Sequence, residues 1–218
     1  MMKKRIVILV SGNGSNAQAI IDACEANKIN GEVVAIISNK AEAYALERAK
    51  HHQIATETII HSEYPDRASF DKALQTRIDC YQPDLIVLAG FMRILTADFV
   101  HQYLGRILNI HPSLLPKYQG LNTHQRAIDN GDEVHGCSVH FVTAELDGGP
   151  IVIQARVSIG ENDNASSLAS KVAKREWQIY PIAVEWFCNN NLTLEKCQVI
   201  HNHQVLPSSG ILYDELSD

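Results

Sequence analysis

The sequence has little of several features that would place it outside the ordinary globular proteins. No apolar run approaches the roughly 18–20 residues that a membrane-spanning helix needs. The five cysteines form no close pair, so their spacing offers neither a C-x-x-C motif nor a zinc-binding pattern. No repeat, low-complexity tract or linker interrupts the chain. These absences favour a reduced, cytoplasmic globular protein, and we expect residues 1–218 to form a single domain.

An excess of positive charge is also missing. The chain carries 19 Lys and Arg against 25 Asp and Glu, which gives a net charge of −6. Nucleic-acid binding depends mostly on basic side chains that neutralise phosphates, so we expect no nucleic-acid partner. A small phosphorylated ligand needs only local donors and is compatible with this charge. The tightest histidine groups, His51-His52 and His201-x-His203, have no third ligand at a suitable spacing, so no metal site is predicted.

The pattern of apolar residues predicts alternating strands and helices in the first half of the chain. Uniformly apolar runs predict buried strands, and apolar residues at helical spacing predict helices. The predicted strands cover residues 5–10, 33–37, 54–58, 84–89 and 107–110. The predicted helices cover residues 15–27, 43–50, 66–81 and 97–104. This alternation indicates a Rossmann-like parallel sheet covered by helices on both faces, which is a three-layer α/β sandwich.

The second half departs from this alternation. Two predicted strands, 136–143 and 151–159, are separated only by a short turn, which predicts an antiparallel hairpin or a local bend rather than a crossover. Residues 164–188 have the pattern of one long helix, and Pro181 should end or kink it near Tyr180 because proline lacks an N–H. Short strand-like pieces follow from Asn191. The expected sheet is therefore mostly parallel with an antiparallel C-terminal part.

A glycine-rich loop, S-G-N-G-S-N-A (11–17), joins the first predicted strand to the first predicted helix. Glycines allow a tight turn, and the helix N-terminus behind them offers free N–H groups to an anion. The loop fits a loose dinucleotide fingerprint, but the second strand ends in I-S-N-K (37–40), without the acid that would hold a ribose. No P-loop motif is present. A simple phosphate is therefore a better candidate than NAD, and the alternative is that Ser15 or Asn16 merely caps the helix.

Asn109 and His111 lie at the carboxyl end of a predicted strand, in the segment N-I-H-P-S-L-L-P (109–116). This end of a strand lines the ligand crevice of α/β sheets, and residues two apart on a strand point the same way. An amide donor beside an imidazole suits acyl transfer, which needs oxyanion stabilisation and a proton transfer. Asp147 could hold the imidazole, or it could be an ordinary turn aspartate. Without a G-x-S-x-G motif, no covalent acyl-enzyme is predicted.

Several motifs together resemble the glycinamide ribonucleotide formyltransferases, folate-dependent enzymes of purine synthesis. The motifs are S-G-N-G-S-N (11–16), L-A-G-F-M-R-I-L (88–95), N-I-H-P-S-L-L-P (109–116), S-V-H-F-V (138–142) and L-D-G-G-P (146–150). The resemblance runs from Ile6 to Leu206 and implies the formyltransferase fold. One departure is the segment Y-Q-G (118–120), where the family commonly has Y-P-G.

The resemblance implies that Asn109, His111 and Asp147 are catalytic. The implied reaction moves the formyl group of 10-formyltetrahydrofolate to the amine of N1-(5-phospho-D-ribosyl)glycinamide by direct attack. The Asn109 amide and a protonated His111 would hold the tetrahedral oxyanion. Asp147 would raise the pKa of His111 and organise the water that relays a proton from the amine to folate N10.

The resemblance also implies two sets of binding residues. The ribonucleotide set is Gly14, Ser15, Asn16, Ala173, Lys174, Arg175 and Glu176. The folate set is Arg67, Met92, Arg93, Ile94, Leu95, Asn109, Thr143, Ala144, Glu145, Leu146 and Asp147. In this scheme the glycine loop holds the phosphate, Glu176 the glycinamide end and Arg67 the glutamate tail of the folate. Formyl folate is the co-substrate, and neither a metal nor NAD is expected.

Two related enzymes and two other classes of protein are the alternatives. Methionyl-tRNA formyltransferase adds a C-terminal RNA-binding domain, and formyltetrahydrofolate deformylase adds an N-terminal regulatory domain. The length and charge of this chain favour neither. A dinucleotide-dependent oxidoreductase lacks its ribose-binding acid here, and the intact trio disfavours an inactive binding module. The expected partners are the two small-molecule substrates, without a membrane, and the sequence leaves the oligomeric state open.

Overall fold

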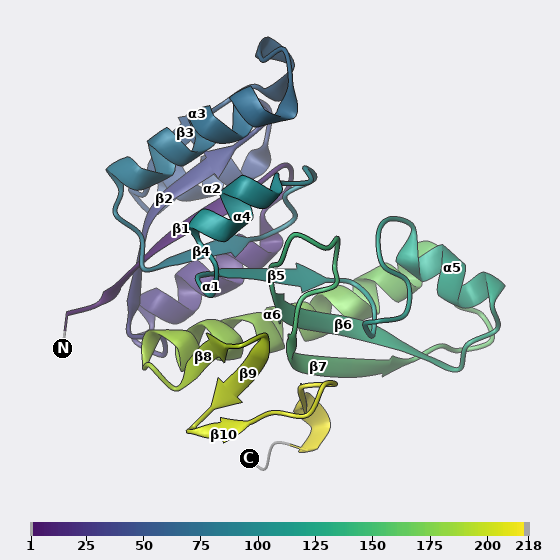
Figure 1. Cartoon of the computed structure of the whole chain (residues 1–218). Helices are drawn as coiled ribbons and strands as arrows, with labels where there is room; N and C mark the ends of the chain where they lie inside the picture. Colours follow the sequence, from purple (N-terminus) through teal and green to yellow (C-terminus); the bar gives the residue numbers. More distant parts are fainter. Residues whose placement is uncertain (1, 216–218) are drawn as a thin grey trace.

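The structure is a computed structural model that describes residues 2–215. An eight-stranded sheet runs through it in the order β11-β7-β6-β5-β4-β1-β2-β3 (Figure 1). The strands are β1 Lys4–Val10, β2 Gly31–Ser38, β3 Ala55–Thr58, β4 Leu85–Leu88, β5 Ile107–His111, β6 Val134–Phe141, β7 Ile151–Ser158 and β11 Ile211–Leu212. The first five pair in parallel, and β6 is antiparallel to both of its neighbours. The predicted mostly parallel sheet and the β6–β7 hairpin are therefore confirmed.

Helices cover both faces of the sheet, as a three-layer sandwich requires. The helices are α1 Ser15–Glu25, α2 Tyr44–His51, α3 Arg67–Cys80, α4 Ala97–Gln102, α5 Thr123–Asp129 and α6 Ala165–Cys188. Alternate residues of β1 explain the layering, because Ile6 and Ile8 pack against α1, α2 and α6, whereas Val7 and Leu9 pack against α3 and α4. Helix α5 was not predicted from the sequence, and it contacts α6 beyond the antiparallel strands.

The C-terminal segment adds a small antiparallel sheet of order β10-β9-β8 (Figure 1). Its strands are β8 Leu192–Glu195, β9 Gln198–His201 and β10 Gln204–Val205, which confirms the predicted strand-like pieces. Two short 3-10 turns, His61–Glu63 and Tyr213–Glu215, complete the described elements. Residue 1 and residues 216–218 of the predicted domain lie outside the described part, and the single-domain assignment stays a prediction.

Helix α6 continues through Pro181, so of the predicted end or kink near Tyr180 the end is wrong. An interior proline costs roughly 3 kcal/mol because it removes one helical hydrogen bond. Burial offsets this cost, since Tyr180, Ala183 and Val184 lie in the core against the sheet. The Tyr180 hydroxyl also lies 3.0 and 2.9 Å from the carbonyl oxygens of Leu88 and Leu108, and so ties α6 to β4 and β5.

The carboxyl ends of β1, β2 and β4 meet at one edge of the sheet, where side-chain contacts tie their loops together. Ser11, directly after β1, donates its backbone N–H to the carbonyl oxygen of Gly90 at 3.1 Å. Its hydroxyl donates to Asn39 Oδ1 at 2.5 Å and accepts the backbone N–H of Met92 at 2.8 Å. Because β1 and β4 are neighbours whose connections leave in opposite directions, this edge is the place where α/β sheets bind ligands.

Candidate active site

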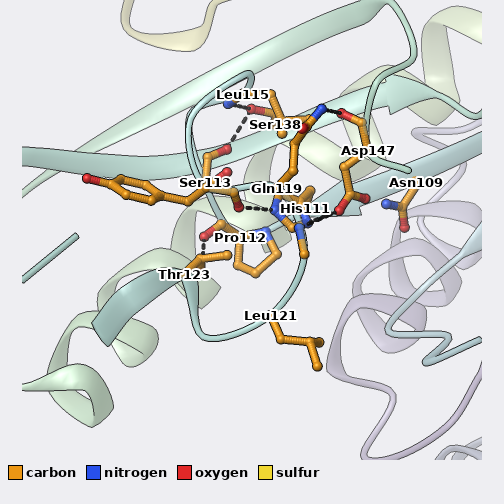
Figure 2. Close-up of polar contacts among 12 residues, drawn as sticks. Asn109, His111, Pro112, Ser113, Leu115, Gln119, Leu121, Thr123, Ser138 and Asp147 are labelled. Carbon is orange, nitrogen blue, oxygen red and sulfur yellow. Dashed lines mark hydrogen bonds and ion pairs between the residues drawn. The ribbon is translucent and has the colours of Figure 1, made fainter. Parts of the chain in front are cut away.

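Asn109, His111 and Asp147 converge at this edge (Figure 2). Asn109 and His111 are the third and last residues of β5, so the alternation of the strand puts both side chains on the same side. Asp147 comes from the loop that joins β6 to β7, and its Oδ2 lies 3.5 Å from Nδ1 of His111. Asp147 lies in a turn, and its carboxylate also faces the imidazole.

Both ring nitrogens of His111 face acceptors. Nε2 lies 2.9 Å from the carbonyl oxygen of Tyr118, which can only accept, so Nε2 carries a hydrogen. Nδ1 faces the Asp147 carboxylate, which also accepts. Only 6% of His111 is exposed, so little water can replace these two acceptors.

The backbone holds Asp147 toward the histidine. Asp147 adopts a left-handed conformation with φ of 47°, which aspartate and asparagine tolerate better than most residues. Its Oδ2 accepts the backbone N–H of Gly120 at 2.9 Å. Two residues later, a side chain at Gly149 would collide with the carbonyl oxygen of Phe141, so only glycine lets the loop turn this closely. The G-G-P turn (148–150) and the Gly120 N–H thus hold the Asp147 carboxylate in place.

A buried hydroxyl holds the segment that follows His111. Ser138, which is fully buried on β6, donates to the carbonyl oxygen of Ser113 at 2.7 Å. The same oxygen accepts the backbone N–H of Leu115 at 3.0 Å and Nε2 of Gln154 at 2.7 Å. These bonds connect β6 and β7 to residues 113–115, so they fix the path of the chain directly after His111.

Ser138→Ala is expected to destabilise the protein by about 1–3 kcal/mol, because buried partners of the hydroxyl lose their hydrogen bonds without access to water. Urea unfolding measures this change. Ser170→Ala is the matched control, since the Ser170 hydroxyl is exposed and bonds only to the preceding turn of α6. An equal effect of the two substitutions would contradict the prediction.

The glycine loop leaves the N-terminus of α1 without a side-chain cap. The N-cap residue is Gly14, so the alternative that Ser15 or Asn16 merely caps the helix is wrong. Gly14 has φ of 77°, and a side chain there would collide with Ala45. The guanidinium of Arg48 donates to the carbonyl and side-chain oxygens of Asn13 at 2.9 and 3.0 Å. Arg48 was missed in the sequence, and it adds positive charge beside the predicted phosphate site.

Asn16 connects this loop to Glu176 on α6. Its Nδ2 donates to Glu176 Oε2 at 2.9 Å, while its Oδ1 is buried without a partner among the described residues. Burial raises the pKa of the Glu176 carboxyl, and the bond from Asn16 opposes that effect. A buried acceptor and a buried carboxyl therefore lie side by side, next to the free end of α1.

The other predicted ribonucleotide residues of α6 lie differently. Ala173 is half-buried one turn before Glu176. Lys174 and Arg175 line another cavity, together with Arg156 of β7. The Arg175 guanidinium lies 3.8 Å from the carboxylate of Asp214 in the C-terminal segment. The structure therefore brings Glu176 to the glycine loop but directs its two basic neighbours elsewhere.

Most of the predicted folate residues lie on two loops beside the trio. Thr143, Ala144, Glu145 and Asp147 line a cavity of about 960 Å³ that also reaches α4 and the C-terminal segment, and Leu146 is half exposed. The loop after β4 carries the other predicted residues, which are Met92, Arg93, Ile94 and Leu95. Met92 and Ile94 are exposed, whereas Leu95 packs in the core.

The two predicted folate arginines have different surroundings. Arg93 stacks over Phe70 with its guanidinium 5.5 Å from the ring centre, and its Nε is buried without a partner in the described part of the chain. Arg67 is the first residue of α3 and is exposed. Its place at the helix start comes from Asp66, whose side chain accepts the backbone N–H of Ser69 and caps the helix.

Two further observations bear on the class of protein. Among residues 2–215, no three His, Cys, Asp or Glu side chains gather as a metal site would need. Over the same residues, no helix is both long and apolar enough to cross a membrane. The expectation that catalysis needs no metal stays a prediction.

The chain is similar to known proteins along most of its length. The family described as formyl transferase matches residues 4–184. The phosphoribosylglycinamide formyltransferase of Escherichia coli (strain K12) is 53% identical over 210 residues, which are 96% of this chain and 99% of that protein. The Haemophilus influenzae protein of the same name is 45% identical over 95% of this chain and 98% of its own. The solved structure of the Coxiella burnetii phosphoribosylglycinamide formyltransferase has a TM-score of 0.93 and 48% identity, with 97% and 99% of the two chains covered.

The fold and the family match over residues 4–184 thus define a formyl transferase, an enzyme that moves a one-carbon group. The high identity along almost the whole chain is more specific. The chain belongs to the phosphoribosylglycinamide formyltransferase family, whose reaction is a formyl transfer of purine biosynthesis. The resemblance in the motifs and the formyltransferase fold are confirmed.

Proposed function

We propose that this enzyme transfers the formyl group of 10-formyltetrahydrofolate to the amine of N1-(5-phospho-D-ribosyl)glycinamide, forming formylglycinamide ribonucleotide and tetrahydrofolate. The convergence of Asn109, His111 and Asp147 at the same edge of the sheet as the free N-terminus of α1 carries the proposal. An amide N–H, an imidazole and a carboxylate are the groups that an attack on a formyl carbon requires.

The first step is the attack of the amine on the formyl carbon. A carbon–nitrogen bond forms, and the carbonyl electron pair moves to the formyl oxygen. The Asn109 amide and the Nε2–H of His111 would donate to this oxyanion, which takes the place of the Tyr118 carbonyl as the acceptor for Nε2. Asp147 would stabilise the positive charge of the imidazolium across 3.5 Å.

The second step is the collapse of the tetrahedral intermediate. The bond from the formyl carbon to folate N10 breaks, and its electron pair stays on N10. The proton lost by the amine reaches N10 through a water that the Asp147 carboxylate would organise. The transfer is direct, because neither step forms a bond between the formyl group and the protein.

Two anionic parts of the substrates would be bound locally. The phosphate would lie against Gly14, Ser15 and the N-terminus of α1, where no side chain occupies the free N–H groups. The glycinamide end would reach Glu176 and the unpartnered Oδ1 of Asn16.

The folate would lie along the 92–95 and 143–147 loops, with its glutamate tail toward Arg67. Ala173, Lys174 and Arg175 remain proposed as neighbours of the ribonucleotide, and their contacts give them less support than Glu176.

A formyl-transfer assay tests the function. The purified protein should form formylglycinamide ribonucleotide only when both substrates are present, and each is omitted in turn as a control. Formate release is measured in the same samples. Formate that appears as fast without the ribonucleotide as with it would indicate a deformylase and contradict the proposal.

Glu176→Gln is expected to raise KM for the ribonucleotide about 10–100-fold, because hydrogen bonds to charged groups contribute roughly 1.5–3 kcal/mol. The same substitution is expected to change the pH dependence of the stability. Burial raises the pKa of Glu176, so its contribution to stability is present below the unfolded pKa and is lost as pH rises through the folded pKa. The wild type should lose stability as pH rises above 4.5, the ordinary pKa of a glutamate. Glutamine does not titrate, so the variant should lack this part of the decline.

Steady-state kinetics and urea unfolding as a function of pH measure both effects. Glu185→Gln is the matched control, since burial also raises the pKa of Glu185 and Asn189 also donates to it, farther along α6. The control should leave KM unchanged. An unchanged KM in Glu176→Gln would remove Glu176 from the ribonucleotide site.

A further inference from the structure

His140 lies beside Asn109, although the sequence analysis gave it no role. The two residues are directly paired across the antiparallel β5 and β6 strands. Only 2% of His140 is exposed, so its ring cannot exchange protein partners for water. Its two ring nitrogens lie within hydrogen-bond distance of Phe141 and Asn109.

The Phe141 contact determines which ring nitrogen carries hydrogen. Nδ1 lies 2.9 Å from the carbonyl oxygen of Phe141, which can only accept, so Nδ1 is the donor. Burial holds the pKa of His140 below its usual range; Asp147 opposes this effect and His111 reinforces it. The ring is therefore neutral near pH 7, and Nε2 presents a lone pair.

That lone pair determines the orientation of the Asn109 amide. Nε2 lies 3.0 Å from Asn109 Nδ2, which donates one of its two hydrogens to it. The reversed amide would place an oxygen lone pair against the nitrogen lone pair, which is repulsive. The second Nδ2 hydrogen then remains free for a substrate oxygen.

The same arrangement determines which histidine can donate to the Asp147 carboxylate. Its Oδ2 lies 3.5 Å from His111 Nδ1, and its Oδ1 lies 3.9 Å from His140 Nε2. Two histidines thus flank one carboxylate. Because His140 has its hydrogen on the far nitrogen, His111 is the one of these two histidines that can present a donor to the carboxylate.

We propose that His140 is a positioning residue, whose Nε2 accepts a hydrogen bond from Asn109 and so keeps an amide N–H, rather than the amide oxygen, toward the formyl oxygen. The inference rests on the proposed function, since it assigns His140 to the oxyanion step. It acts through Asn109 and does not itself touch the substrate.

Three substitutions separate this role from simple packing. Gln places its amide oxygen near the position of Nε2 and restores an acceptor, whereas Asn reaches only the position of Nδ1 and Leu offers no acceptor. His140→Leu and His140→Asn should lower kcat about 10–100-fold, part of the effect of losing one oxyanion donor. His140→Gln should stay within about threefold of the wild type, and KM should change little in all three.

A double-mutant cycle tests whether His140 acts through Asn109. In an Asn109→Ala background, His140→Leu should change kcat by less than about threefold, because the amide that it orients is gone. A full 10–100-fold loss in that background, a loss confined to KM, or equal losses in the Gln and Leu variants would overturn the proposal. Thermal unfolding identifies variants that fail to fold.

A measurement on the wild-type protein decides the hydrogen bond independently of activity. Nitrogen-15 NMR of the His140 ring at pH 7 should show Nδ1 protonated and Nε2 unprotonated. A hydrogen on Nε2 would overturn the proposal even if every variant were slow. If the wild type failed to formylate the ribonucleotide, the proposed function would fall, while the NMR result would still decide the orientation of Asn109.

Discussion

His111→Asn is expected to lower kcat about 10²–10⁴-fold, the range for loss of a positioned acid–base group. One nitrogen of the imidazole contacts the carbonyl oxygen of Tyr118, and the other faces the Asp147 carboxylate. Asparagine keeps a polar side chain but carries no positive charge, so the oxyanion loses its charged donor. Affinity for both substrates should change little, because the interaction is made mainly in the transition state.

Single-turnover kinetics with saturating substrates measure the chemical step of this variant. His52→Asn is the matched control, because His52 also pairs with a carboxylate, Glu25 Oε1 at 2.7 Å, but lies at the end of α2. The control should keep wild-type kcat. Wild-type transfer by His111→Asn would show that the mechanism is wrong.

Asp147→Asn is expected to lower kcat about 10²–10³-fold, the scale of one lost electrostatic contact in a transition state. The substitution isolates charge from shape. Asparagine tolerates the left-handed conformation of residue 147, and its amide oxygen can still accept the Gly120 N–H. The variant loses the negative charge that would stabilise the imidazolium of His111.

The double variant His111→Asn with Asp147→Asn sharpens this test. Because the aspartate would act on the histidine, the double variant should be about as slow as His111→Asn alone. Asp129→Asn is the control, since Asp129 is an exposed carboxylate that accepts from Gln125 on the same helix. Multiplied losses in the double variant would mean that Asp147 acts independently of His111.

The local sequence predicted most of the fold because its elements have strong periodicity. The apolar strand predicted within residues 84–89 formed at Leu85–Leu88, and the hairpin around residues 147–150 formed as well. Helix α5 was missed because Ala127 and Ile128 are the only apolar residues among its seven, which leaves no apolar stripe at helical spacing. Pro181 does not end α6, because local propensity counts the lost hydrogen bond but not the burial of the neighbouring Tyr180, Ala183 and Val184.

The site was predictable only in part for a related reason. Asn109 and His111 share one strand, so the period of two was enough to predict that they lie on one face. The contact of Asp147 with His111 depends on the path of the β6–β7 loop. His140 gave no signal of its own, because a histidine in an apolar strand looks the same whether its ring nitrogens face an amide or a carbonyl.

The sequence by itself determined the layered α/β class, the glycine loop before α1 and the pair of polar residues at the end of β5, because these depend on neighbours in the chain. Only the tertiary structure decided that Asp147 faces His111, that Glu176 joins Asn16 while Arg175 turns to Asp214, and that His140 accepts from Asn109. Distances and hydrogen-bond directions between separate strands depend on register and burial, and local periodicity encodes neither.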